Sequence, residues 1–231
     1  MKKDQTVARR SFLAVAGGAL VSIGLPGTFV RLADAEQGAL AASTRPDGRP
    51  RLPPGQTAVE RIRPMGGTPG TATIADWSLR VYGEVERPVV LSYQELLEME
   101  QVHITCDIHC VTGWTLLDSR WGGVRLSTIM NRVKPRGRGG FIIFEAAAGY
   151  TSNLPISEAR KEDVILAHSF FGEKLARAHG APVRAVVPDR YLYKSAKWLE
   201  AVKISAADEP GFYERLGYSN SADPWKQERF Q

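Results

Sequence analysis

The sequence predicts an α+β domain in which a few short helices accompany mixed β-sheets. Segments with the alternation or the short apolar runs of strands outnumber segments with helical periodicity. The helical segments are short and begin at capping residues. Glycine and proline interrupt the chain often, with 22 Gly and 14 Pro among 231 residues. The hydrophobic content of 43% is ordinary for a globular protein that buries a core.

The first 35 residues have the pattern of an export signal. The pair Arg9-Arg10 matches the twin-arginine type of signal, the mildly apolar run Phe12–Pro26 follows it, and Ala33-Asp34-Ala35 resembles a cleavage site. We therefore predict a twin-arginine signal peptide over residues 1–35, cleaved near Ala35, and a periplasmic protein. An ordinary secretory signal and an uncleaved anchor remain alternatives.

Residues 36–73 are predicted to be a linker or irregular segment, because proline and glycine recur there. Their second half, from residue 61, is a glycine-rich loop that leads into the folded domain over residues 74–231. Residues 1–35 carry +3 of the chain's net charge of +5, which leaves about +2 for the remainder. So small a charge gives no reason to expect a nucleic-acid partner.

The first half of the domain is predicted to alternate strands with two short helices. Strands are expected over Trp77–Gly83, Val89–Leu91 and Gln101–Thr105. A capping box of Ser92 and Glu95 predicts a helix over Tyr93–Glu98. Ser127 is expected to cap a second helix over Thr128–Val133.

The second half of the domain is predicted to be richer in strands. Strands are expected over Phe141–Ala146, Val164–Ala167, Val183–Val187 and Trp198–Ile204. Gly149–Pro155 is predicted to be a loop, Ser157 to cap a helical turn through Arg160, and Phe171–Glu173 to be a turn. The aromatic tail from Glu209 is expected to pack over the body of the domain.

The two cysteines of the chain, Cys106 and Cys110, lie in the stretch Thr105–Trp114, close to His103 and His109. One interpretation is a buried thiol, or a Cys106–Cys110 disulfide in an exported, non-catalytic binding module. A second is a zinc site built from both cysteines and both histidines, although their spacing is poor. A third is a cysteine thiolate that binds a soft metal carried by a cofactor.

A second group of polar residues lies in residues 179–198. Arg184 stands inside an apolar strand, where alternation alone would place it on the solvent face. Alternatively, His179, Arg184, Ser195 and Lys197 gather around one phosphate, because arginine offers a forked pair of donors and lysine a point charge.

Three blocks of the sequence, in this order, resemble the sulfite-oxidase-like molybdopterin-dependent oxidoreductases. They are His109-Cys-Val-Thr-Gly-Trp114, His179-Gly-Ala-Pro-Val-Arg184 and Lys194-Ser-Ala-Lys-Trp198. The resemblance covers roughly residues 75–231. It is greatest to small exported bacterial members, which include the catalytic subunit of a periplasmic methionine-sulfoxide reductase. It implies a sulfite-oxidase-type molybdopterin-binding domain.

The resemblance also implies roles for individual residues. Cys110 would be the thiolate ligand of the molybdenum. The residues implied to hold the pterin and its phosphate are Cys110, His179, Arg184, Ser195, Ala196 and Lys197. Lys194 stands where sulfite oxidases carry an arginine of the substrate pocket, and His109 and Tyr150 are further candidates for the catalytic pocket.

The implied function is that of a molybdenum-dependent oxidoreductase with a molybdopterin cofactor. It would catalyse two-electron oxygen-atom transfer on a small oxo substrate, by sulfoxide or N-oxide reduction or by sulfite-type oxidation. No haem domain is fused to the sequence, so an external electron partner is expected, either a membrane haem protein or a soluble cytochrome. The binding-module and zinc interpretations stay open at this point.

Overall fold

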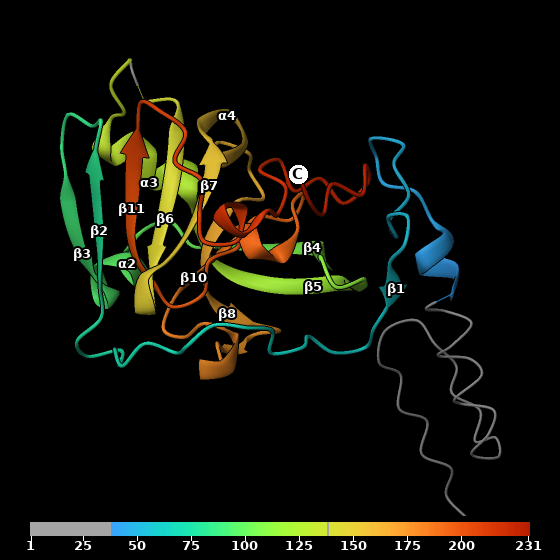
Figure 1. Cartoon of the computed structure of the whole chain (residues 1–231). Coiled ribbons are helices and arrows are strands. Elements are labelled where there is room, and N and C mark those ends of the chain that lie inside the picture. The colour runs from blue at the N-terminus through green and yellow to red at the C-terminus, as the bar shows by residue number, and fades with distance from the viewer. Residues whose placement is uncertain (1–37, 138) are drawn as a thin grey trace, which may run out of the picture. The chain divides into compact units, whose positions relative to one another are not determined.

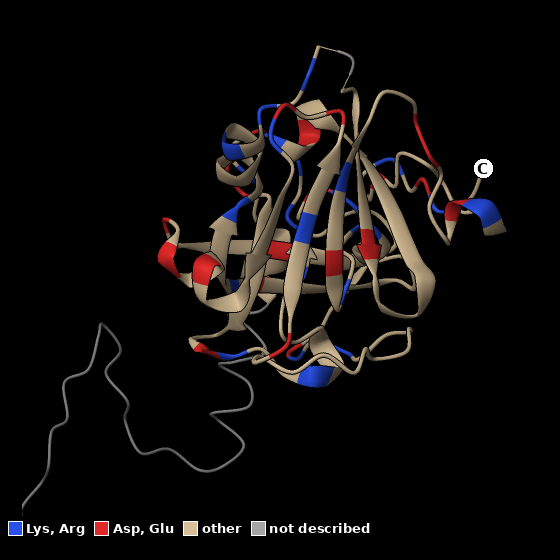
Figure 2. Ribbon diagram, turned by 90° about the vertical axis from the view of Figure 1, so that its left-hand side faces the viewer, with Lys and Arg blue, Asp and Glu red and all other residues tan. Residues whose placement is uncertain are grey.

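The computed structural model describes residues 38–137 and 139–231, so the predicted signal peptide over residues 1–35 lies outside the described part. Within that part, two mixed sheets with short helices confirm the predicted fold class (Figure 1). No helix among these residues has both the length and the hydropathy that crossing a membrane requires. Lys and Arg are interspersed with Asp and Glu over the body of the domain (Figure 2).

The five-stranded sheet has the strand order β3-β2-β11-β6-β7. Its strands are β2 (Ser78–Gly83), β3 (Val89–Ser92), β6 (Phe141–Ala146), β7 (Tyr150–Pro155) and β11 (Leu199–Ser205). Strands β2 and β11 are parallel, whereas the other neighbours are antiparallel. Because β11 is central, the chain that enters it from the Lys194–Trp198 block is anchored to the rigid part of the domain.

The six-stranded sheet has the order β1-β5-β8-β10, with β4 also paired to β5 and β9 to β8. Its strands are β1 (Thr57–Ala58), β4 (Val102–Cys110), β5 (Trp114–Arg125), β8 (Ile165–Phe170), β9 (Glu173–Lys174) and β10 (Arg184–Val186). Strand β1 comes from the segment predicted to be a linker, and it runs parallel to β5. The cysteine-containing β4 and the arginine-bearing β10 therefore belong to one sheet.

The helices are short, as predicted. They are α2 (Tyr93–Glu98), α3 (Leu126–Val133) and α4 (Ile156–Ala159), with 3-10 turns η1 (Ala147–Gly149), η2 (Arg177–His179), η3 (Leu192–Lys194) and η4 (Glu214–Leu216). The capping box at the start of α2 is confirmed. The Ser92 hydroxyl accepts a hydrogen bond from the Glu95 amide at 3.2 Å, and the Glu95 carboxylate accepts one from the Ser92 amide at 2.8 Å.

Two predicted caps were wrong. Helix α3 begins at Leu126, one residue before the expected helix cap Ser127, and its N-cap residue makes no side-chain hydrogen bond. Helix α4 begins at Ile156, so Ser157 lies inside it rather than at its cap. In both cases a buried apolar residue occupies or adjoins the first turn, and its packing outweighs the serine's weak preference for the cap.

Two strands were also missed in part. The predicted loop over residues 149–155 is mostly strand β7, and its buried polar residues hid the alternation. Ser152 is one of them, and its hydroxyl donates to the Lys194 carbonyl at 3.1 Å. Strand β4 does not end at Thr105 but continues to Cys110 across an irregularity between Cys106 and Ile108. Cys110 is thus the last residue of the strand.

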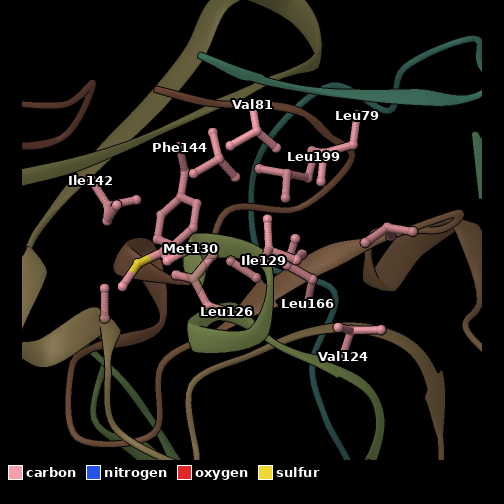
Figure 3. Packing of buried hydrophobic residues seen from close by; sticks show 14 of the residues in the cluster. Leu79, Val81, Val124, Leu126, Ile129, Met130, Ile142, Phe144, Leu166 and Leu199 are labelled. Carbon is pink, nitrogen blue, oxygen red and sulfur yellow. The ribbon is translucent and has the colours of Figure 1, made fainter. Parts of the chain in front are cut away.

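The main core lies between helix α3 and the five-stranded sheet (Figure 3). The helix buries residues at the spacing i, i+3, i+4 and i+7, which is one face of a helix: Leu126, Ile129, Met130 and Val133. Figure 3 shows Leu126, Ile129 and Met130 on the side of the helix that faces Phe144 and Val81 of the sheet. Val124 and Leu166 of the other sheet lie on the remaining side. This core joins the two sheets, so it fixes the position of β5 and β8 relative to β6 and β11.

Candidate functional site

A cavity of about 220 Å3 brings together residues that are far apart in the sequence. It is lined by the end of β4 and by the η2 and η3 turns. The loop before the domain and the C-terminal tail complete the lining. The candidate site residues in its lining are Cys110, Tyr150, His179, Arg184, Ser195 and Lys197. The described lining contains no aspartate or glutamate. The charged side chains of the lining are therefore all basic, and they share the cavity with the thiol.

Cys110 occupies a fixed position at the end of β4. Its side chain is 4% exposed, and its sulfur lies 3.1 Å from the Thr112 hydroxyl oxygen. A tight turn follows, in which the Gly113 amide donates to the Cys110 carbonyl at 3.0 Å, and Gly113 adopts a φ of 96° that favours glycine. The Gln56 side chain donates to the same carbonyl at 3.1 Å. These bonds hold the thiol at the cavity wall.

The disulfide and zinc interpretations have no support in this geometry. Cys106 and Cys110 are both free thiols of strand β4. Four residues of extended strand separate their Cα atoms by roughly 13 Å, and a disulfide needs less than about 7 Å. The four proposed zinc ligands are spread along the same strand. Within residues 38–137 and 139–231, no three His, Cys, Asp or Glu side chains are placed to hold a metal.

Cys106 also differs from Cys110 in its surroundings. Its sulfur lies outside the cavity lining, 3.7 Å from the Ser119 hydroxyl. Burial raises the pKa of the Cys106 thiol to about 12. A thiol of that pKa stays protonated near neutral pH and is a poor metal ligand.

Arg184 lies in β10 with its guanidinium buried against the cavity. The residue is 3% exposed, and its guanidinium carbon is 5.2 Å from the centroid of the Trp121 ring. Its three hydrogen bonds all go to backbone carbonyls: His179 at 3.0 Å, Ser195 at 2.9 Å and Ala185 at 3.2 Å. Burial lowers the pKa of Arg184 to about 10. Neutral carbonyls orient this cation but do not neutralise it.

Lys197 and His179 add to the same positive region. The Lys197 ammonium donates to the carbonyls of Met65 at 2.8 Å, Gly66 at 2.7 Å and Ala178 at 3.3 Å. Burial, with a smaller contribution from Arg184, lowers the pKa of Lys197 to about 8. Burial and the two cations also lower the pKa of His179. Because Arg184 lowers the pKa of both neighbours, an anion bound between these groups would stabilise their charged forms.

The glycine-rich loop predicted before the domain forms one wall of the cavity. Residues 62–67 contribute to the lining, and Lys197 holds their carbonyls. A Cβ atom on Gly67 would lie 2.6 Å from the Trp198 ring, so only glycine permits this close approach. The sequence indicated a glycine-rich loop here but did not show that it lines the cavity.

Ser195, Tyr150 and Ala196 differ in where they lie relative to the cavity. The Ser195 hydroxyl accepts from the Val187 amide at 3.0 Å at the edge of the cavity. The Tyr150 hydroxyl donates to the Tyr193 carbonyl, and burial raises the pKa of Tyr150 well above its usual value. Ala196 is 1% exposed in the main core and does not line the cavity. A contact of the Ala196 side chain with a ligand there has no support in this placement.

His109 also lies outside the cavity lining. It is fully buried, its Nδ1 atom is 2.8 Å from the Thr115 hydroxyl, and its ring is 5.0 Å from that of Trp225. Burial lowers the pKa of His109 to about 4, so the ring is neutral at physiological pH. It supports β4 behind Cys110, because adjacent strand residues point to opposite faces.

The structure corrects the place expected for Lys194. Its side chain is 1% exposed, forms an ion pair with the buried carboxylate of Glu214 and donates to the Asn153 side chain. It borders a different hollow, beside Asn153 and Asn220, and does not line the cavity with Cys110. The positive charge implied for the substrate pocket is therefore absent from this wall of the cavity and is neutralised by Glu214.

Replacing Lys194 by methionine is expected to lower the free energy of unfolding by about 3–5 kcal/mol, because Glu214 is left buried without its partner. The matched control is Lys203→Met, since Lys203 pairs with Glu209 at 2.8 Å but both are partly exposed. That change is expected to cost about 0–1 kcal/mol. Urea unfolding of the full chain measures both. Equal losses in the two variants would contradict the assignment of a buried pair.

The Lys197 pKa predicts a pH dependence for anion binding to cofactor-free protein. A bound anion favours the ammonium form, so affinity is highest below the pKa of about 8 and falls as the pH rises through it. Sulfate stays a dianion throughout, and its affinity is expected to be about tenfold weaker at pH 9 than at pH 7. Titration calorimetry measures this. Lys197→Met should bind weakly with little change over the same range, and an unchanged wild-type affinity would contradict the prediction.

No sequence pattern indicated the tyrosines that complete the cavity. Tyr193 belongs to η3, whereas Tyr213 and Tyr218 come from the C-terminal tail, and all three line the cavity. The aromatic content of the tail was the available signal. Nothing in its spacing showed that the tail folds back onto Cys110.

Comparison with known proteins agrees with this geometry. Residues 65–213 match the family model described as the oxidoreductase molybdopterin binding domain. The chain is similar to the uncharacterized oxidoreductase YuiH of Bacillus subtilis (strain 168), with 38% identity over 182 residues, 78% of this chain and 92% of the relative. It is also similar to the protein-methionine-sulfoxide reductase catalytic subunit MsrP of Ralstonia nicotianae, with 28% identity over 68% of this chain and 56% of the relative.

Among solved structures, the fold resembles the sulfane dehydrogenase SoxCD from Paracoccus pantotrophus. The TM-score is 0.56 with 23% sequence identity, over 63% of this chain and 41% of that chain. At this identity the likeness concerns the fold alone. The chain spans only about half the length of the methionine-sulfoxide reductase relative, with 56% of it covered.

Proposed function

Because the chain belongs to the oxidoreductase molybdopterin-binding domain family, we propose that it is a molybdopterin-dependent enzyme that transfers an oxygen atom in a two-electron reaction. The observation that supports this proposal best is the cavity in which a buried thiol meets basic groups without a carboxylate. A buried cation whose hydrogen bonds all go to neutral carbonyls is costly unless an anion joins it. The residues therefore suit a ligand with both a soft metal and a phosphate.

Cys110 is the residue proposed to ligate the molybdenum, since a thiolate suits a soft metal. Arg184, Lys197 and His179 are proposed to hold the phosphate of the pterin, with Ser195 at the same wall. When bound, the cofactor supplies the two-electron redox chemistry and the exchange of an oxygen atom. The chain supplies the fixed thiol, the charge that retains the cofactor and the walls that limit access.

The residues of the chain are arranged for these tasks. Hydrogen bonds to the Cys110 carbonyl hold the backbone of Cys110 in place at the cavity wall. The guanidinium of Arg184 is held by three carbonyls, so it is oriented before any ligand arrives. Preorganised charge of this kind costs little reorganisation on binding. Tyr150, with its hydroxyl engaged by Tyr193, closes the cavity between these groups.

We also propose export by the twin-arginine route and an external electron partner, a membrane haem protein or a soluble cytochrome. The motif Arg9-Arg10 supports the first part. The proposed electron partner rests on a similar protein whose name describes it as the catalytic subunit of a methionine-sulfoxide reductase.

Replacing Arg9 and Arg10 by lysines and following the chain by cell fractionation tests export by the twin-arginine route. Unchanged export would contradict it.

Metal and pterin analysis of the full chain, produced in cells that make molybdopterin, tests the function. We expect one molybdenum and one pterin per chain, and turnover of a sulfoxide or N-oxide with a reduced dye, or of sulfite with an oxidised one. One zinc per chain instead would favour the zinc interpretation. A stable protein without either metal or pterin would overturn the proposal.

A further inference from the structure

The turn that follows Cys110 is bound by two segments that do not line the cavity. One is residues 49–59, which we call the strap, and the other is residues 222–230, the last part of the C-terminal tail. In sequence order, the described lining of the cavity begins at Ile62 and ends at Tyr218. Both segments therefore lie outside the residues that the proposed function assigns to the cofactor.

The strap binds strand β4 before Cys110, at Cys110 itself and after it. Before it, the Arg51 guanidinium donates to the Asp107 carboxylate at 2.9 Å. At Cys110, the side-chain amide of Gln56 donates to the backbone carbonyl at 3.1 Å. After it, strand β1 pairs with the start of β5. Gln56 is 8% exposed, so its hydrogen bond is shielded from water.

Arg229 joins the turn, the strap and the tail. Its guanidinium donates to the Val111 carbonyl and, at 3.2 Å, to the Gly55 carbonyl of the strap. Its guanidinium carbon lies 5.4 Å from the centroid of the Tyr191 ring. The planar fork of an arginine holds two acceptors in a fixed relation to each other. Arg229 therefore fixes Val111 relative to the strap residue that precedes Gln56.

Trp225 joins the tail to the strap beside the same strand. Its ring N–H donates to the Pro50 carbonyl at 2.7 Å, and the Arg49 guanidinium carbon lies 3.8 Å from the centroid of its ring. A cation at that distance over an indole face is attracted to it. The Trp225 ring also lies 5.0 Å from that of His109, the residue before Cys110. The strap and the tail thus meet directly behind the thiol.

From these contacts we infer that Arg229 and Gln56 are positioning residues for the Cys110 thiolate. They hold the carbonyls of residues 110 and 111, so the strap and the tail form a clamp that sets where the sulfur stands in the cavity. The inference rests on the proposed function, because it concerns the thiolate proposed to ligate the molybdenum. Misplacing a reacting group by about 1 Å costs up to about 100-fold in rate.

The first test follows the alkylation of both cysteines by iodoacetamide in cofactor-free full-length protein. Arg229→Met and Gln56→Met remove the donors and keep an unbranched side chain. Each is expected to raise the rate at Cys110 about tenfold, since loss of such a hydrogen bond favours local opening by about that factor. The rate at Cys106, located by peptide mass spectrometry, should not change. General destabilisation would expose both thiols, so equal acceleration contradicts a positioning role.

The second test uses molybdenum-loaded protein and whichever sulfoxide, N-oxide or sulfite the wild type turns over. Arg229→Met is expected to lower kcat about tenfold and leave KM within about twofold, because the lining that contacts the substrate is unchanged. The electron paramagnetic resonance spectrum of the partly reduced metal should change, while molybdenum and pterin content stay at the wild-type level. Arg229→Lys keeps a cationic donor and should restore at least half of the lost activity.

Two matched controls remove the same kind of hydrogen bond elsewhere. Arg215→Met removes a guanidinium that donates to the Pro210 carbonyl at 2.7 Å, in the tail but outside the clamp. Gln101→Met removes a side-chain amide that donates to the Leu96 carbonyl at 2.8 Å, just before the other end of β4. Both controls are expected to behave as wild type in both tests.

The outcomes separate this inference from the proposed function. An unchanged alkylation rate at Cys110 in Arg229→Met and Gln56→Met, or an equal acceleration at Cys106, overturns the clamp and leaves the molybdenum enzyme intact. A wild-type kcat and spectrum in loaded Arg229→Met do the same. If Arg229→Met does not fold, Gln56→Met takes its place in both tests. A chain without molybdenum and pterin overturns the proposed function, whereas alkylation still decides whether the clamp holds the thiol.

Discussion

Replacing Cys110 by serine is expected to abolish oxygen-atom transfer, with a loss of at least about 100-fold in kcat. An alkoxide or hydroxyl is a hard ligand and replaces the soft thiolate that we propose for the metal. The substitution removes no large volume, and the backbone bonds that hold this turn do not use the side chain. Fold and cavity should therefore persist while the reaction fails.

The matched control is Cys106→Ser in the same strand, because Cys106 lies outside the cavity lining. Activity in that variant is expected to stay within about twofold of wild type, since surroundings without a metal ligand tolerate the change. The electron paramagnetic resonance spectrum of the partly reduced metal should change in Cys110→Ser alone. Wild-type activity with an unchanged spectrum in Cys110→Ser would refute the assignment of the ligand.

Replacing Arg184 by methionine is expected to reduce molybdenum and pterin content to below about a tenth of wild type, because a charge-assisted pair to a phosphate is among the stronger polar contacts. Loss of fold is not expected. The change removes a buried cation whose pKa is already lowered to about 10, and it leaves the carbonyls of residues 179, 185 and 195 without a donor. Removing the buried cation stabilises the fold and offsets part of the cost of the unsatisfied carbonyls. We therefore expect a net loss of about 1–3 kcal/mol in the free energy of unfolding.

Metal analysis and thermal unfolding of the purified variant check both parts of this prediction. Arg80→Met is the matched control, because the Arg80 side chain is 58% exposed and pairs with Glu145 at a surface of the other sheet. It should keep full cofactor content. Full molybdenum occupancy in Arg184→Met would show that this guanidinium does not retain the cofactor.

The elements that could be predicted are those whose information is local. The capping box at Ser92 and the apolar run of β6 act within a few residues, so the sequence was sufficient to place α2 and β6. The structure also brings four basic or thiol candidates, including Cys110 and Arg184, to one cavity. Strand β7 was not predicted, because its buried polar residues form hydrogen bonds with partners distant in sequence. The Ser152 hydroxyl, for example, donates to the Lys194 carbonyl.

Contacts between residues distant in sequence also limited what could be predicted about the site. The resemblance indicated that Lys194 is a pocket cation, but a residue beyond the end of β11, Glu214, pairs with it and turns it away from the cavity. Similarly, the tail residues Tyr213 and Tyr218 reach the thiol only because the tail folds back over β7, where the Phe212 amide bonds the Thr151 carbonyl at 2.8 Å. Such pairings depend on long-range contacts that no local pattern encodes.

The amino-acid order of this chain was enough to specify its class of fold, the thiol beside a turn glycine and the group of basic residues suited to a phosphate. These follow from backbone periodicity, turn chemistry and charge, which act over short stretches of sequence. Folding in three dimensions was needed to decide which charges face the cavity and which are neutralised, and that tyrosines cover the thiol. Burial and ion pairing depend on which distant segments meet, and hydrophobic packing of the whole domain sets that arrangement.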